Sequence, residues 1–407
     1  MIKKASKTHQ KPQEYITERI KVEKLIPGGQ ALGTLKNGKK IFLWNALPGE
    51  IVTKALITKE KSHYLEATAL DFEHLSKNRI APRDACYLST SPWQIFDYQY
   101  ELSEKHALLK ENFRQQEIDL DAQPVWTDNH EFGYRNKMEY SLYYDHADAK
   151  IHLAFHERAS HRKVPITQSS LERSAILSRA QSVVDQLNQE HADARKFQSL
   201  LLRASQSNQV SGGLFENFQP RPIFPRLQDT ILGVEYSYSP NGFFQINLPV
   251  YEEALRTIKS WIKTQKVLDL YAGVGTIGLS VASGHDLTLV ECDKSAFQEM
   301  ETNCRSAMRN WSTPPRPILA KSEEALEYIT PDQTVILDPP RAGCQPQLLE
   351  RLIEIHPPTI AYLSCNPATQ ARDVKILSEK YQINICQPFN FFPRTPHLEN
   401  LIILTPK

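Results

Sequence analysis

The sequence predicts an α/β protein made of three units: a small β-barrel, a central α+β region, and a C-terminal sheet of mostly parallel strands with helices on both faces. Three observations carry this prediction. Short strand-like runs separated by Gly and Pro turns fill about the first 70 residues. Two long amphipathic runs with strand-like pieces follow. From about residue 248 onward, strand-like and helix-like runs alternate, and this alternation is typical of a parallel sheet with helices on both faces.

Length and composition agree with this division. The chain has 407 residues, enough for two or three domains, and 41% of them are hydrophobic, so cores can form. No apolar run approaches the ~18 residues that a membrane span needs. The basic N-terminus lacks the apolar stretch of a signal peptide. We therefore expect a cytoplasmic protein without a membrane partner, acting as a monomer.

The cysteine spacing and the charge distribution indicate which stabilising sites the protein lacks and which kind of partner it could bind. None of the six cysteines has C-x-x-C spacing, which argues against a disulfide framework and against a zinc site. Residues 1–61 hold 13 Lys and Arg against 5 Glu and no Asp, a formal charge of +8. The remainder holds 35 against 42, a charge of −7. A basic head suggests contact with a polyanion, and a solvated basic tail is the alternative.

The first unit, residues 1–73, is predicted to be an OB-like barrel after about a dozen polar residues. Strand-like runs occupy 16–25, 30–35, 41–44, 51–57 and 64–70, and Asn37-Gly38 predicts a hairpin turn. Barrels of this kind bind oligonucleotides on a basic face. The lysines that could form such a face are Lys36, Lys39, Lys40, Lys54, Lys59 and Lys61.

The second unit, residues 74–247, is predicted to be α+β. Its patterns indicate helices over 98–118 and 169–189 and strands over 134–144, 151–155 and 197–203. Two basic clusters with interleaved aromatic or His residues, at 134–137 and 156–163, suit phosphate contacts and base stacking. An ordinary solvated surface is the alternative for each cluster.

The third unit, residues 248–407, contains the clearest alternation. Predicted strands lie at 266–272, 287–292, 316–320, 334–337, 359–364, 383–388 and 401–405, and predicted helices include 295–310, 346–355 and 368–379. This order predicts a Rossmann-like domain, in which ligands bind at the carboxyl ends of the strands.

A glycine-rich turn follows the first of these strands. Gly273 and Gly275 would let a cofactor approach the backbone, and Gly278 would let the next helix pack closely. The next strand ends in Glu291, an acid placed to accept hydrogen bonds from a ribose. These features fit a dinucleotide or S-adenosylmethionine equally well.

Asp338-Pro339-Pro340-Arg341 closes a later strand and favours S-adenosylmethionine. The two prolines would end strand pairing and stiffen a loop that holds Asp338 beside the cofactor crevice. A dinucleotide-dependent dehydrogenase has no need of such an element. A plain strand-ending turn is the alternative interpretation.

Cys365 lies between a strand-like run and a helix-like run, so we expect it at the carboxyl end of a strand beside a helix N-terminus. The positive end of that helix should favour the thiolate. A lone cysteine is more often a small buried core residue. However, Asp269, Asp338 and Cys365 fall at the ends of three strands of one sheet, which would make the cofactor and the thiol neighbours.

Two further polar residues lie in loops at the borders of this unit. Glu399, in an apolar and proline-rich segment, could have the raised pKa of a general base, although a surface glutamate is the commoner case. Near it, His397 is more often structural than catalytic. Gln245 could bond the amino-acid end of the cofactor, with loop capping as the alternative.

Together these motifs resemble the RNA 5-methyluridine methyltransferase family, and the first unit resembles a TRAM domain, an RNA-binding barrel. The family motifs match residues 244–247, 269–275, 338–341, 364–367 and 392–399, and the TRAM turns match 27–33, 37–40 and 47–50. The resemblance implies a class I methyltransferase domain that binds S-adenosylmethionine. It implies a nucleophile at Cys365 and a base at Glu399, with cofactor contacts at Gln245, Tyr271, Glu291 and Asp338.

One departure from the family concerns iron. Relatives with a TRAM domain often carry a four-cysteine iron–sulfur site in the central region, but here only Cys86 remains in residues 79–94. Leu88 and Ser91 stand where a C-x-x-C pair would be, and Ser169 stands where the fourth ligand would be. One thiolate cannot hold a cluster that needs four. We therefore expect no iron–sulfur cluster.

The chemistry implied by the resemblance is methylation of uridine C5 in RNA. A thiolate would add to C6, C5 would take a methyl group, and a base would remove the C5 proton. We expect the RNA to be 23S ribosomal RNA, with tRNA as the alternative. A dinucleotide-dependent oxidoreductase and an inactive RNA-binding protein remain as alternatives from other classes.

Overall fold

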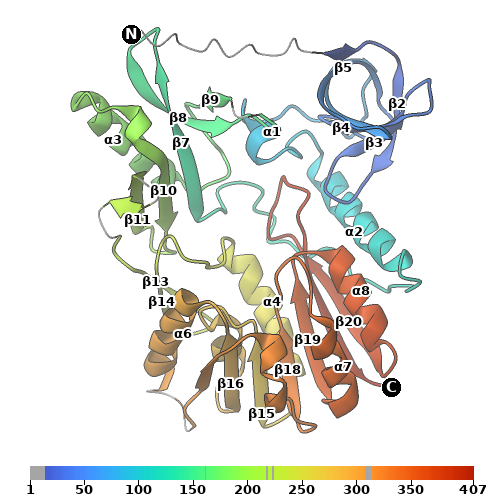
Figure 1. Cartoon of the computed structure of the whole chain (residues 1–407), viewed down its shortest axis with the longest axis vertical. Coiled ribbons are helices and arrows are strands. Elements are labelled where there is room, and N and C mark those ends of the chain that lie inside the picture. The colour runs from blue at the N-terminus through green and yellow to red at the C-terminus, as the bar shows by residue number, and fades with distance from the viewer. Residues whose placement is uncertain (1–13, 161, 217–218, 222–223, 309–310, 312) are drawn as a thin grey trace, which may run out of the picture.

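The computed structural model describes residues 14–407 except 161, 217–218, 222–223, 309–310 and 312. Figure 1 shows the barrel and the central sheet side by side, with the C-terminal sheet and its helices below both. No helix in the described ranges combines the length and the apolar character needed to cross a bilayer.

The N-terminal strands form the predicted barrel. The sheet order is β1-β5-β2-β3-β4-β6, and the additional pairing of β5 with β6 closes it. Inward positions of β2, such as Ile20 and Val22, are buried while their neighbours are exposed, which is the alternation expected of a strand with one face in a core. The bounds are β1 Tyr15–Ile16, β2 Ile20–Leu25, β3 Ala31–Thr34, β4 Lys40–Trp44, β5 Ile51–Glu60 and β6 Tyr64–His74.

The central unit is an antiparallel sheet of order β12-β11-β10-β7-β8-β9 covered on one face by α3. Ile176, Ala180 and Val184 of α3 are buried against it at helical spacing. The bounds are α1 Tyr87–Thr90, α2 Tyr98–Arg114, β7 Lys137–Asp145, β8 Lys150–His156, β9 Lys163–Pro165, α3 Ser174–Gln189, a short 3-10 helix Ala194–Lys196, β10 Phe197–Ala204, β11 Val210–Glu216 and β12 Gln219–Arg221.

Two elements that the sequence groups with the central unit pack on the C-terminal one. Leu109 and Phe113 of α2 share a buried cluster with strands of the C-terminal sheet and with α8 (Pro367–Leu377). The hairpin of β13 (Leu227–Ile231) and β14 (Val234–Tyr238) joins the cluster on the other face of that sheet. We therefore propose a border between the two units near residue 226 instead of 247.

The C-terminal sheet has seven strands in the order β17-β16-β15-β18-β19-β21-β20. The first five are parallel, and β21 runs antiparallel to both of its neighbours. The bounds are β15 Lys266–Leu270, β16 Asp286–Glu291, β17 Arg316–Leu319, β18 Gln333–Leu337, β19 Thr359–Ser364, β20 Tyr381–Phe389 and β21 Glu399–Pro406. The predicted mostly parallel sheet is confirmed.

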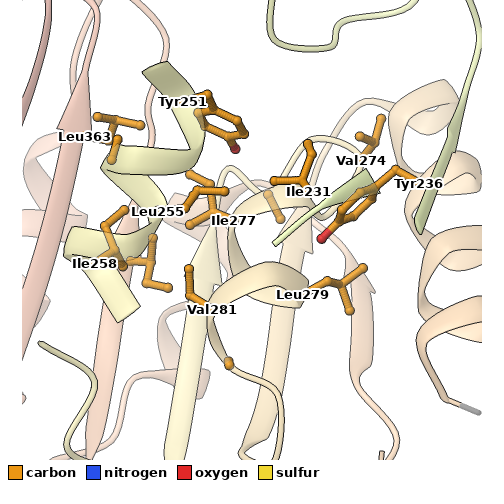
Figure 2. Close-up of a cluster of buried hydrophobic side chains, with 14 of the residues drawn as sticks. Ile231, Tyr236, Tyr251, Leu255, Ile258, Val274, Ile277, Leu279, Val281 and Leu363 are labelled. Atoms are coloured by element: carbon orange, nitrogen blue, oxygen red, sulfur yellow. The ribbon is translucent and has the colours of Figure 1, made fainter. Parts of the chain in front are cut away.

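Helices cover both faces of this sheet. On one face, Tyr251, Leu255 and Ile258 of α4 pack with Ile277 of α5 and with Leu363 of β19 (Figure 2). Leucines of α7 and α8 form the buried cluster on the other face. The bounds are α4 Leu248–Trp261, α5 Thr276–Val281, α6 Lys294–Ala307, α7 Pro346–Ile355 and α8 Pro367–Leu377, with 3-10 turns at Ser322–Glu324 and Leu326–Tyr328.

Candidate active site

The site lies where adjacent parallel strands of the C-terminal sheet end. β15, β18 and β19 are neighbours in the sheet, and each is followed at the same edge by a segment that the sequence singled out. The glycine-rich turn follows β15, Asp338 follows β18, and Cys365 follows β19. The predicted convergence of the turn, the carboxyl and the thiol is therefore seen in the structure.

Asp269 is the penultimate residue of β15 and lies within electrostatic reach of Asp338 and Glu291. It lies inside β15, is fully buried, and accepts a hydrogen bond of 2.7 Å from the Gly278 N–H through Oδ2. Burial raises its pKa to about 8. A Cβ at Gly278 would lie 2.8 Å from the same oxygen, so Gly278 does allow the close packing that was predicted. Asp269 fastens the turn to the start of α5.

Cys365 and Glu399 are brought together by the antiparallel pairing of β19 with β21. Ser364 pairs with Asn400, so the next opposed positions along the register are Cys365 and Glu399. Opposed residues point to the same face of a sheet, with Cβ atoms roughly 5 Å apart. The negative charge of Glu399 raises the pKa of the Cys365 thiol, consistent with this proximity. The two residues therefore form one centre.

The prediction that Cys365 is a favoured thiolate is wrong for this state. Burial, followed by the charges of Glu399 and Asp338, raises the pKa of its thiol to about 11, while Arg341 opposes the shift. The thiol is therefore neutral at neutral pH.

The neighbouring helix does not compensate for this shift. The Asn366 side chain accepts the Ala368 N–H at 3.2 Å, and Pro367 at the first helical position has no N–H to offer. The Asn366 cap therefore engages one of the few N–H groups that the N-terminus of α8 could offer to a thiolate.

Glu399 has the raised pKa that a general base needs. It is only 6% exposed, and burial, with a smaller contribution from Asp338, raises the pKa of its carboxyl well above the usual value. Burial also raises the pKa of Asp338 to about 7. Glu399 starts β21 instead of ending a loop, so its position is set by strand register. The predicted raised pKa is confirmed.

Arg341, which sequence reasoning left without a role, lies close to both Cys365 and Glu399. Its backbone carbonyl accepts hydrogen bonds from the Asn366 side chain at 2.8 Å and from Thr369 Oγ1 at 3.2 Å, which fastens the loop after β18 to α8. Its exposed guanidinium lowers the pKa of both Cys365 and Glu399. Its place in the Asp-Pro-Pro-Arg run was the available signal.

The glycine-rich turn leaves room for a ligand. The Gly273 N–H donates to Glu291 Oε2 at 2.8 Å, and a Cβ at Gly273 would meet nothing within 4 Å. Gly275 has φ +87°, a conformation that favours glycine. Glu291, at the end of β16, therefore holds its carboxylate against the turn beside open space. These features fit the ribose and backbone contacts that S-adenosylmethionine would make.

Tyr271 and Gln245 were both expected to contact the cofactor, and their surroundings differ. The Tyr271 ring packs into the buried cluster on the α7–α8 face, and its φ is +62°. Any cofactor contact from Tyr271 would therefore come from its backbone. The Gln245 carbonyl accepts the Asn136 side-chain amide at 2.9 Å, which ties this loop to the central unit. Cofactor contacts at these two residues remain predictions.

Phe243 is a second residue that the sequence did not mark. Its side chain is 72% exposed, the highest value among the large apolar side chains of the described residues. Lys137 Nζ donates to the carbonyls of Asn241 at 3.1 Å and Gly242 at 3.2 Å, so the loop that carries Phe243 is fastened to β7. An exposed ring on a fixed loop is suited to stack on a flat group.

The two basic surfaces predicted from the sequence are only partly available. In the barrel, Lys39 pairs with Glu60, Lys40 with Glu23, and Lys59 with Glu66. In the central unit, Tyr134 is buried and donates its hydroxyl to the Pro393 carbonyl at 3.0 Å, so it does not offer a stacking face. Arg158 lies over the Trp44 ring at 4.1 Å and helps to join the barrel to the central unit.

The segment expected to have lost an iron–sulfur site carries a hydrogen-bond network. Asp84 Oδ2 accepts from Gln94 Nε2 at 2.9 Å, and the same amide donates to Ser91 Oγ at 2.7 Å. Ser169 Oγ donates to Glu172 at 2.5 Å. Burial raises the pKa of the Cys86 thiol to about 11. Ser91 and Ser169, at two of the positions that would hold ligands in relatives, are therefore hydrogen-bonded to other side chains.

We predict that the chain purified without oxygen contains no stoichiometric iron. Cys86 alone supplies a thiolate in residues 79–94, and cluster assembly needs four such ligands. Iron analysis together with the absorption spectrum of the purified protein checks this. An iron content near one cluster per chain would refute it.

Three family models match separate parts of the chain. Residues 326–407 match the model described as tRNA (Uracil-5-)-methyltransferase. Residues 15–70 match the TRAM domain, and residues 249–366 match a model described as conserved hypothetical protein 95. The first match contains Asp338, Cys365 and Glu399, and the second spans the barrel.

Relatives match over nearly the whole length. A protein of Thermosynechococcus vestitus named as an uncharacterized RNA methyltransferase is 26% identical, with 97% of this chain and 99% of that protein covered. One of the same name from Prochlorococcus marinus is 27% identical over 88% of this chain and 99% of its own. The crystal structure of Pyrococcus abyssi tRNA (uracil-54, C5)-methyltransferase with S-adenosyl-L-homocysteine has a TM-score of 0.75 and 23% identity, covering 95% and 99% of the two chains, and shows the same fold.

The carboxyl-edge site, the glycine-rich turn and these matches define an RNA methyltransferase that uses S-adenosylmethionine. Within that class, residues 326–407 match the tRNA (Uracil-5-)-methyltransferase model, and the first unit is a TRAM domain. The resemblance noted from the five motifs is thereby confirmed. The alternative of a dinucleotide-dependent oxidoreductase is wrong.

Proposed function

We propose that the chain methylates C5 of a uridine in RNA through a covalent adduct, with Cys365 as the nucleophile and Glu399 as the base that removes the C5 proton. The observation that carries the proposal is the opposed placement of Cys365 and Glu399 on β19 and β21. Both lie at the strand edge that also carries the glycine-rich turn and Asp338. The reaction needs a nucleophile, a base and a bound methyl donor. The thiol of Cys365, the buried carboxyl of Glu399 and the glycine-rich turn are suited to these three tasks.

The chemistry follows from the poor nucleophilicity of uracil C5. Attack of the Cys365 thiolate on C6 forms the S–C6 bond and moves the C5–C6 π electrons into an enolate that is nucleophilic at C5. S-adenosylmethionine supplies the methyl group. When Glu399 takes the C5 proton, the released electron pair restores the C5–C6 double bond and expels the thiolate. The S–C6 bond that forms in the first step is thus broken in the last step, and Cys365 is free again.

Arg341 supports both ionised groups. Cys365 must lose a proton to attack, and Glu399 must be ionised to accept one, yet burial raises the pKa of each. The Arg341 guanidinium lowers both pKa values. We propose that it stabilises the thiolate and the carboxylate in the working enzyme.

The residues expected to hold the cofactor fit it chemically. Glu291 presents a carboxylate beside the open side of Gly273, as hydrogen bonding to ribose hydroxyls requires. Asp338 places a carboxyl near Cys365 and Glu399, and its negative form would favour a sulfonium cation. Gly275 provides the tight turn, while Gln245 would orient the amino-acid end.

The RNA is proposed to be ribosomal RNA, with the target uridine unstacked from its neighbours so that C6 can reach the thiol. The fold neighbour named a tRNA (uracil-54, C5)-methyltransferase makes tRNA the second candidate. Incubation with purified 23S ribosomal RNA and, separately, with tRNA in the presence of labelled cofactor tests this, followed by mapping of the labelled base. Label at a position other than uridine C5, or in neither RNA, would overturn the proposal.

We predict that RNA binding weakens as salt rises and that the barrel contributes to the slope. No ion pair of Lys36 or Lys61 is present in the described part of the chain, so both are available to phosphates. Changing both to alanine should reduce the slope of log affinity against log salt by about 1–2. Lys380→Ala, in the connection between α8 and β20, serves as the control. Binding that does not respond to salt would contradict this role of the barrel.

A further inference from the structure

The barrel touches the segment that leads into Glu399. Gly29 lies in the turn between β2 and β3 with φ +90° and is buried. A Cβ at this position would lie 2.3 Å from Cβ and 2.6 Å from Cγ of Pro396. The absence of a side chain at Gly29 therefore allows the barrel turn to rest against Pro396, three positions before Glu399 in the chain.

Trp93 links the same turn to the same segment a second time. Its indole N–H donates to the Gly29 carbonyl at 3.0 Å, and its backbone N–H donates to the Arg394 carbonyl at 3.1 Å. The ring is 1% exposed, belongs to the buried core of the barrel, and stacks on Phe96 with centroids 4.7 Å apart. Trp93 follows the barrel in sequence but packs into its buried core, and it is hydrogen-bonded to both the barrel turn and the segment that leads to Glu399.

A buried charge network from α2 holds the other side of this segment. Glu101 and Lys105 are almost fully buried and pair at 2.8 Å. The Glu101 carboxylate accepts the Arg394 backbone N–H at 3.0 and 3.1 Å, and Lys105 Nζ donates to Asn390 Oδ1 at 2.6 Å and to the Phe392 carbonyl at 3.1 Å. These contacts fix the backbone of residues 390–394.

Arg394 itself is held in an uncommon conformation. Its φ is +64°, its guanidinium donates to the Phe96 carbonyl at 2.5 Å, and it pairs with Glu131. Such backbone strain persists only where the surroundings determine it, and here they are the Phe96 carbonyl, Glu131 and Glu101 of α2. The conformation of residues 390–394 is therefore fixed by contacts with residues that lie far away in the sequence.

We propose that the N-terminal barrel positions the general base: Gly29 and Trp93 fix residues 390–398, and these fix where Glu399 starts β21 opposite Cys365. Gly29 and Trp93 are positioning residues, and the barrel has this role in addition to contacting RNA. The inference rests on the proposed role of Glu399. It implies that damage to the turn slows removal of the C5 proton even when RNA is fully bound.

The test compares two adjacent glycines. Gly28 and Gly29 have φ +98° and +90°, so alanine introduces similar backbone strain at both, but a Cβ at Gly28 meets nothing within 4 Å. Gly29→Ala should reduce the single-turnover rate at saturating RNA and cofactor by about 10–100-fold. Gly28→Ala should stay within about twofold of the wild type. RNA affinity should change little in either variant.

A second readout separates positioning from a general loss of stability. If Glu399 is misplaced, the covalent RNA adduct should persist in Gly29→Ala and resist denaturing gel electrophoresis, as it should in Glu399→Gln. Should Gly29→Ala fail to fold, Trp93→Phe removes the indole N–H bond to Gly29 and part of the buried ring but keeps an aromatic group beside Phe96, and it should give the same adduct with a smaller rate loss.

The outcomes are distinguishable. Equal rates for the two glycine variants, or weaker RNA binding with an unchanged saturated rate, would overturn the positioning role. If Glu399→Gln traps an adduct and neither Gly29→Ala nor Trp93→Phe does, only this inference fails. If Glu399→Gln traps none, the proposed function of Glu399 fails as well.

Discussion

Cys365→Ala is expected to lower methylation of uridine by about four orders of magnitude or more, because the reaction depends on a nucleophile that alanine cannot replace. Cys292 also follows a strand of this sheet, but that strand, β16, is separated from β19 by β15 and β18, so Cys292 does not stand opposite Glu399 and cannot take the place of Cys365. Label transfer from S-adenosylmethionine to RNA under single-turnover conditions measures the effect.

Cys86→Ala is the matched control for this variant. Burial raises the pKa of the Cys86 thiol to about 11, the same value as for Cys365, but Cys86 packs in the core of the central unit. This change should leave the rate near that of the wild type. RNA and cofactor affinity should survive in both variants. A Cys365→Ala enzyme that methylates uridine at a normal rate would rule out the covalent mechanism.

Glu399→Gln is expected to trap RNA on the enzyme. The amide keeps the size of the carboxyl but cannot accept the C5 proton, so the adduct through Cys365 forms and is not resolved. Turnover should fall by about 10²–10⁴-fold, while a protein–RNA species that survives denaturation accumulates. Gel electrophoresis and mass spectrometry of the complex detect it. The exposed Glu379 offers a control, since Glu379→Gln should neither slow turnover nor trap RNA.

The raised pKa of Glu399 also predicts the direction in which the rate of adduct decay changes with pH. The pKa of Glu399 is raised well above its usual value, so its carboxylate is lost as pH falls through that raised pKa. In the wild type, decay of the adduct should therefore slow on acidification. The slow decay in Glu399→Gln should lack this dependence, because the amide does not titrate. Normal, pH-dependent turnover by Glu399→Gln would show that another group removes the proton.

Much of the C-terminal sheet could be predicted because local signals agree there. The strand Thr359–Ser364 and the helix Pro346–Ile355 are found as predicted, since prolines and a change of hydrophobic period mark their ends. The joint position of Asp338 and Cys365 followed from the rule that parallel strands end at one edge. These inferences needed no knowledge of tertiary contacts.

What could not be predicted depends on partners far away in sequence. The amphipathic pattern of α2 shows that Leu109 and Phe113 are buried, but not that α8 and the C-terminal sheet bury them. The burial of Tyr134 under Pro393 is likewise invisible in a basic, aromatic run. The pKa of Cys365 was misjudged because burial and then the charges of Glu399 and Asp338, all set by tertiary packing, raise it.

Because β21 runs antiparallel to β19, the position of an insertion or deletion in this part of the chain should decide whether it is tolerated. Nucleophile and base are matched by ladder register, so shifting Leu401–Leu404 by one residue against β19 would turn the Glu399 carboxyl to the opposite face of the sheet. Insertions in the exposed connection between α8 and β20 leave that ladder intact and should be tolerated. A single deletion inside the ladder should silence the enzyme although every side chain of the centre is still encoded.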